Sequence, residues 1–80
     1  MENVKRFHLT PHSARRLSDR EISAEEMKDA VKYHDEKHPM GPGENGGKKY
    51  KFAKKTNGRT LVVIAELKKG ECWLITTFYE

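Results

Sequence analysis

The chain has 80 residues, which is enough for one domain with a thin core but not for a deep cavity around a large cofactor. Its net charge is +4, and its single cysteine, Cys72, excludes a disulfide framework and a four-cysteine metal site. The single cysteine indicates a reducing compartment, so we expect a cytoplasmic protein, and we expect no cofactor. There is no run of about 18 apolar residues, so no membrane segment is expected.

Positive charge is concentrated in the second half of the chain. The stretch from Lys48 to Arg59 contains six cations and no acid, whereas residues 21–37 are acidic. A segment with charge of one sign creates a local positive field that suits a polyanion. Two interpretations stay open from charge alone: a surface for nucleic acid or phosphate, and a basic face that is simply solvated.

Two short helices are predicted in the N-terminal part. Thr10-Pro11 is a typical helix start, and the first helix is expected over residues 11–18. The sequence Ser23-Ala24-Glu25-Glu26 has the form of a capping box and predicts a second start. Apolar spacing continues this second helix through Met27, Ala30, Val31 and His34.

Residues 36–49, with the sequence EKHPMGPGENGGKK, are rich in glycine and proline. They lack apolar periodicity, so they predict a flexible loop. A phosphate-binding P-loop is not expected here, because its first glycine would fall on Pro42 and Lys48 is followed by Lys49 instead of serine or threonine.

The C-terminal half predicts a three-stranded meander. KKYKFAKK and RTLVVIAEL flank Asn57-Gly58, a strong hairpin signal, and CWLITTFYE follows a tight link at residues 68–71. We expect Phe52 to face Val63, and Val63 in turn to face Thr76. The core face is then formed by Tyr50, Phe52, Leu61, Val63, Ala65, Leu74 and Phe78. The other, half-open face carries Lys51, Lys55, Thr60, Val62, Ile64, Trp73, Ile75, Thr77 and Tyr79.

These elements predict a single α+β domain over residues 1–80. Two short N-terminal helices are expected on one face of a twisted antiparallel sheet of three to four strands, with residues 4–8 as the optional fourth strand.

Three short motifs resemble a known family: His12-Ser13-Ala14-Arg15-Arg16, Arg20-Glu21-Ile22-Ser23 and Thr76-Thr77-Phe78-Tyr79. They are similar to the small domain-of-unknown-function family related to the RelE and BrnT toxins, and the resemblance covers nearly the whole chain. It implies a RelE-like fold and a metal-independent RNA endonuclease toxin, either in a toxin–antitoxin pair or as the terminal toxin of a secreted protein. One departure is Glu21, where glycine is common.

The resemblance leaves two alternatives open. The wider superfamily includes ParE-like toxins that act on a protein target. The same fold can also serve as a non-catalytic module that binds nucleic acid or a partner protein.

Metal-independent RNA cleavage needs a base, an acid and cations near the phosphate. His12 is the first catalytic candidate, because the imidazole pKa of about 6.5 suits proton transfer. Arg16, one helical turn further, is expected to hold the phosphate. Tyr79 and Thr77 complete the candidate catalytic set. The candidates for binding RNA are Arg15, Arg20, Lys51, Lys55 and Arg59.

Trp73 and Ile75 are candidates for binding a partner on the half-open face, where an acidic antitoxin or immunity protein is expected. The alternative for Trp73 is a stacking platform for a base.

The pairs His8/His12 and His34/His38 have a four-residue spacing that suits zinc on one helix. Each pair straddles a predicted helix end, so no metal site is expected.

Overall fold

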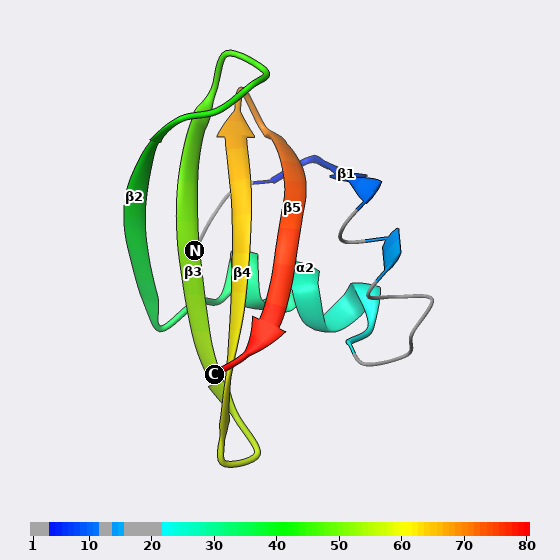
Figure 1. Cartoon of the computed structure of the whole chain (residues 1–80), viewed down its shortest axis with the longest axis vertical. Helices are drawn as coiled ribbons and strands as arrows, with labels where there is room; N and C mark the ends of the chain where they lie inside the picture. The colour runs from blue at the N-terminus through cyan, green and yellow to red at the C-terminus, as the bar shows by residue number, and fades with distance from the viewer. Residues whose placement is uncertain (1–3, 12–13, 16–21) are drawn as a thin grey trace.

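The computed structural model describes residues 4–11, 14–15 and 22–80. Its five strands form one sheet in the order β1-β5-β4-β3-β2. Figure 1 shows this sheet with β2 at the left edge, β1 beyond β5 on the right, and α2 crossing behind. The elements in chain order are β1(Arg6–Leu9), α2(Ala24–Lys32), β2(Glu36–Pro42), β3(Lys48–Thr56), β4(Arg59–Lys68) and β5(Glu71–Tyr79).

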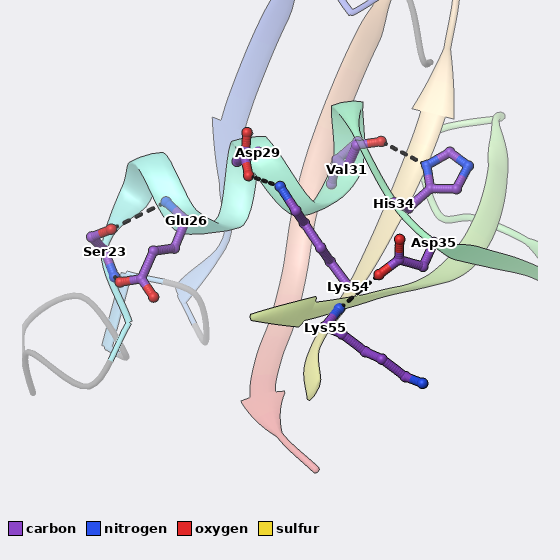
Figure 2. A network of polar contacts seen from close by, with 8 residues as sticks. All are labelled: Ser23, Glu26, Asp29, Val31, His34, Asp35, Lys54 and Lys55. Atoms are coloured by element: carbon purple, nitrogen blue, oxygen red, sulfur yellow. Dashed lines mark hydrogen bonds and ion pairs between the residues drawn. The ribbon is translucent and has the colours of Figure 1, made fainter. Parts of the chain in front are cut away.

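The capping box predicted for the helix is confirmed. Ser23 Oγ accepts a hydrogen bond from the Glu26 amide at 3.1 Å, and the Ser23 amide donates to Glu26 Oε1 at 3.0 Å (Figure 2). Met27, Ala30 and Val31 are fully buried against the sheet. His34 lies beyond the helix end, where its ring hydrogen-bonds the Val31 carbonyl and contacts Phe52. The predicted apolar stripe therefore forms the helix side of the core.

The two tight turns of the meander are also confirmed. Asn57 and Gly58 both have positive φ, at 48° and 78°, and they connect Thr56 to its partner Arg59. Lys69 and Gly70 repeat this arrangement between β4 and β5, with φ of 47° and 81°. Two successive positive φ values define the hairpin turn whose twist matches that of the strands. This turn fixes the predicted pairing of Phe52 with Val63.

The predicted fold class is wrong in the size and type of the sheet. The described chain has five strands instead of three or four, and β1 runs parallel to β5, so the sheet is mixed. Residues Arg6–Leu9 do form the optional strand, but the partner Glu71–Leu74 lies more than 60 residues away in the sequence. A pairing this distant leaves no turn signal by which the sequence could reveal it.

The prediction of two helices is also not met in the part of the chain that the structure describes, which contains one, α2. Most of the range 11–18 lies outside the described residues. Within it, Pro11, Ala14 and Arg15 have helical backbone, and the Ala14 amide donates to the Thr10 carbonyl at 2.9 Å.

The loop predicted over residues 36–49 is wrong for its first half, because Glu36–Pro42 forms β2 and pairs with β3. Pro39 and Pro42 cannot donate hydrogen bonds to a neighbouring strand. They are tolerated here because β2 is the edge strand of the sheet, where one row of donors has no partner strand. The proline and glycine content thus marks an edge strand instead of a structureless loop.

A bulge in β5 changes the faces predicted for its last residues. Ala65 pairs with Leu74 as expected, but Ile64 pairs with Thr76 and Val63 with Thr77, so Ile75 is an extra residue. The Thr10 hydroxyl lies against this bulge, 2.7 Å from the Leu74 carbonyl oxygen and 2.8 Å from that of Ile75. Thr77 and Tyr79 are therefore turned toward α2, and Phe78 is turned away from it.

The core lies between α2 and this face of the sheet. Phe52 and Leu74 are among its fully buried side chains. The whole cluster comprises Ile22, Met27, Ala30, Val31, Phe52, Leu61, Val63, Ala65, Cys72 and Leu74. The helix α2 covers this face, and no helix of the described residues lies on the opposite face (Figure 1).

Candidate nucleic-acid interface

The sheet face opposite α2, here called the open face, carries most of the polar side chains of the sheet. Alternation along a strand sends successive side chains to opposite faces, so the neighbours of core residues lie on this face. Register places His8 of β1 beside Trp73 of β5, and Trp73 beside Glu66 of β4. The charged and aromatic residues of the open face include Arg6, His8, Lys49, Lys51, Lys55, Glu66, Glu71 and Trp73.

A histidine, a glutamate and a tryptophan meet at the β1–β5 border of the open face. His8 Nε2 lies 2.8 Å from Glu71 Oε1, and both side chains are partly exposed, at 34% and 40%. The His8 ring stacks on the Trp73 indole with the ring centres 5.1 Å apart and the planes 18° apart. The imidazole is therefore held on two sides and still reaches solvent.

This geometry fixes which nitrogen of His8 can act as a base. An ionised carboxylate only accepts hydrogen bonds, so Nε2 must carry the proton that it shares with Glu71. In the neutral ring, Nδ1 then keeps a lone pair.

The open face that carries this group also carries several cations. Arg6, Lys49 and Lys55 form no ion pair with another described residue, whereas Lys51 lies 3.6 Å from Glu80. In Figure 2, Lys54 reaches up to Asp29 of α2 while its neighbour Lys55 extends away from the helix. The predicted lysines of β3 therefore divide between the two faces, and Lys51 and Lys55 lie on the open one.

Glu66 is a buried carboxylate in the middle of the open face, with 1% of its surface exposed. It accepts hydrogen bonds from the amide and side chain of Asn45 and from the amide of Gly47 at 2.7 Å. Burial raises the pKa of Glu66, but the hydrogen bonds from Gly47 and Asn45 together outweigh burial and hold the pKa below its ordinary value. Glu66 thus anchors the β2–β3 loop onto the sheet.

Glycine at position 43 is required by this anchoring. A Cβ on Gly43 would overlap the Glu66 side chain, so another residue fits only if the loop or the hydrogen-bonded Glu66 carboxylate moves. Part of the glycine content that predicted flexibility therefore serves close packing around a buried charge.

A pocket of about 310 Å³ opens beside Trp73, between the anchored loop and the bulge of β5. Its walls combine the apolar side chains of Trp73 and Ile75 with polar groups of Asn45 and Lys49. Glu66 and Lys49 line the pocket from the β4 side of Trp73, and Thr10 and Pro11 line it from the end of β1. His8 stacks on Trp73 from β1 and is not among the pocket walls.

The predicted catalytic residues His12 and Arg16 lie outside the described residues, as does the RNA-binding candidate Arg20. Arg15 is described and is exposed. Their predicted roles stay predictions.

Thr77 and Tyr79 lie on the α2 face, so the prediction that they share a face with Lys51 is wrong. Arg59, the third candidate, also lies on the α2 face. Thr77 is fully buried and donates its hydroxyl to the Val62 carbonyl at 2.9 Å. The Tyr79 hydroxyl donates to Glu26 Oε2 at 2.6 Å, and the Arg59 guanidinium lies 3.7 Å from the centre of the Tyr79 ring. The bulge in β5 causes the change of face of Thr77 and Tyr79. All three residues therefore have structural contacts on the α2 face.

Replacement of Tyr79 by phenylalanine is expected to raise the pKa of Glu26. The Tyr79 hydrogen bond is the main cause that holds this pKa below its ordinary value of 4.5, followed by that of the Ser23 amide. NMR titration of the Glu26 carboxyl group measures the change. Tyr33→Phe is the control, since Tyr33 is exposed and contacts Lys54 instead. An unchanged Glu26 titration in Tyr79→Phe would contradict the contact.

Sequence reasoning placed Trp73, Ile75, Lys51 and Lys55 on the open face, and they lie there. It missed Arg6, Glu71 and the role of His8. The alternation in RFHL does place Arg6 and His8 on one face. Only the parallel pairing of β1 with β5 shows that this face meets Glu71 and Trp73.

In the described part of the chain, the fold and the open face define a small mixed-sheet domain with α2 on one side and a basic, aromatic surface on the other. The chain belongs to the family described as Domain of unknown function (DUF4258), which matches residues 9–79. The matched range contains Glu71, Trp73 and the anchored loop and begins one residue after His8. No curated protein and no solved structure matches the chain significantly.

Two further observations concern the described part of the chain. None of its helices is long and apolar enough to cross a membrane. Within the same residues, no three histidine, cysteine, aspartate or glutamate side chains are grouped so that they could hold a metal ion.

Proposed function

We propose that the protein binds single-stranded RNA on the open face and cleaves it without a metal ion. The observation that carries this proposal is the His8–Glu71 pair, held 2.8 Å apart against Trp73, with Arg6 next to it on the same face of β1 and further cations across the open face. It places a proton acceptor beside cations and an aromatic ring, on a face that α2 does not cover.

In the proposed reaction, His8 Nδ1 takes the proton of a ribose 2′-hydroxyl. The 2′-oxygen attacks the adjacent phosphorus, and the bond from phosphorus to the 5′-oxygen breaks. The products are a 2′,3′-cyclic phosphate and a 5′-hydroxyl, whose proton comes from the His8 imidazolium or from water. Arg6, two residues from His8 on the same face of β1, would balance the extra charge on the phosphate oxygens.

The motifs that resemble the RelE and BrnT toxins support the same chemistry and would place the protein among ribonuclease toxins. A toxin of this kind would need an acidic antitoxin or immunity protein. The open face suits such a partner, because its cations surround the partly exposed apolar side chains of Trp73 and Ile75.

The test uses a single-stranded RNA oligonucleotide and purified protein in the presence of EDTA. We expect fragments that end in 2′,3′-cyclic phosphate, and we expect His8→Ala to cut about 10²–10⁴-fold more slowly. His38→Ala is the matched control, because His38 also faces a glutamate, Glu36, at 3.2 Å but lies on the exposed edge strand β2. It should cut at the wild-type rate.

Two results would contradict the catalytic proposal. One is equal cleavage by wild type and His8→Ala. The other is salt-dependent RNA binding with no cleavage by the wild type, which would identify a non-catalytic binding module.

A further inference from the structure

The pocket beside Trp73 is built for a flat ligand, and nothing in the proposed cleavage step uses it. We propose that it holds one unpaired base of the bound RNA, stacked on the face of the Trp73 indole that points away from His8. This inference rests on the proposed function, since it names the part of the substrate that the open face recognises.

Stacking is the first argument. Trp73 already forms one near-parallel stack with His8 on its β1 side, at 5.1 Å and 18°. On its β4 side the neighbouring row is formed by Glu66 and Lys49, and both line the pocket, which Thr10 and Pro11 close from the end of β1. A base in the pocket would add a third ring to the stack that His8 and Trp73 already form. Base–aromatic stacking is the usual way in which proteins hold single-stranded RNA.

The size of the pocket is the second argument. Its volume of about 310 Å³ lies at the lower end of the range for small-molecule sites. Such a space accepts a single heterocycle that has been unstacked from its neighbours. A duplex keeps its bases paired and cannot present one to this wall, so the pocket selects single-stranded RNA.

The third argument is a polar group held ready at the pocket wall. The Asn45 amide and its Nδ2 group donate to the buried Glu66 carboxylate, which holds the side chain in place. Asn45 Oδ1 accepts no hydrogen bond from another described residue. An anchored amide of this kind can accept a hydrogen bond from the edge of a base. Lys49, on the same wall, is positioned for the phosphate that follows.

The test exploits the fact that Trp73 is the single tryptophan of the chain. Its fluorescence is recorded while the wild-type protein is titrated with a 2′-O-methyl oligoribonucleotide, which cannot be cut. An abasic oligomer of equal length carries the same phosphate charge and serves as the matched ligand. We expect quenching by the base-bearing strand only, and about tenfold tighter binding of that strand.

Variants at position 73 test whether Trp73 causes the preference for the base-bearing strand. In Trp73→Leu, binding measured by anisotropy of labelled oligomers should be equal for both ligands, and in Trp73→Phe the preference for the base-bearing strand should partly persist. Circular dichroism checks that both variants fold. A duplex of the same sequence should leave the wild-type fluorescence unchanged.

The outcomes separate this inference from the function on which it rests. Equal, salt-dependent binding of both oligomers without quenching would overturn the base pocket and leave RNA binding on the open face intact. No binding of either oligomer at low salt would overturn both. A preference for the base-bearing strand that survives Trp73→Leu would also overturn the pocket, because the base would then be recognised elsewhere.

Discussion

Replacement of Glu66 by glutamine is expected to lower the free energy of unfolding by about 2–3 kcal/mol. The side chain is 1% exposed and accepts hydrogen bonds from Asn45 and Gly47. A glutamine has nearly the same shape but no charge, and its NH2 group would face one of these donors. The cost is that of weakened or unpaired donors in a buried site. Urea denaturation measures the loss.

The loss should depend on pH in a defined direction. The pKa of Glu66 lies below its ordinary value of 4.5 in the folded protein, so the unfolded chain binds a proton more readily than the folded one. The contribution of Glu66 is therefore complete above pH 4.5 and decreases as the pH falls below that value. The difference between wild type and Glu66→Gln should shrink over the same acidic range.

Glu44→Gln is the matched control for the Glu66 experiment. Glu44 lies in the same loop, but its side chain is exposed. The same neutralisation should therefore change stability by less than about 0.5 kcal/mol. Equal losses for Glu66→Gln and Glu44→Gln would show that the loop is not anchored by the buried carboxylate.

Replacement of Phe52 by alanine is expected to cost about 3–5 kcal/mol. Phe52 is fully buried between β3 and α2, and its ring contacts those of His34 and Tyr50 at 5.0 and 6.0 Å. A domain of this length has a total stability of about 4–12 kcal/mol, so the variant should be largely unfolded at elevated temperature. Thermal and urea denaturation measure the change.

Phe78→Ala is the matched control, because it removes the same phenylalanine ring from the opposite face of the sheet. The bulge turns Phe78 away from α2, to a partly exposed position beside Val62. Its removal should therefore cost clearly less than that of Phe52. A loss as large as that of Phe52→Ala would place Phe78 in the core. It would then contradict the bulge and the resulting position of Tyr79 beside Glu26.

Local features of the fold could be predicted because their signals lie within a few residues of one another. The capping box at Ser23 and Glu26 places donor and acceptor three residues apart, and Asn57-Gly58 specifies a two-residue turn by its tolerance of positive φ. The turn then determined the register of β3 and β4.

The sequence alone also determined which residues of the meander could form a basic, aromatic face. Strand alternation placed Lys51, Lys55 and Trp73 together without knowledge of the rest of the chain. It did not determine the faces of Thr77 and Tyr79, because the extra residue Ile75 reverses the alternation after Leu74. The bulge is held by Thr10, a contact between residues 65 positions apart.

Only the tertiary structure decided the candidate site. Pairing β1 with β5 brings His8 to Glu71 and Trp73, and folding the β2–β3 loop onto the sheet brings Asn45 to Glu66. These contacts join segments far apart in the chain, and each stabilises the protein only when the whole sheet has formed. Sequence periodicity reports which face of its own strand a residue occupies, but the identity of the neighbouring strand is set by the packing of the complete domain.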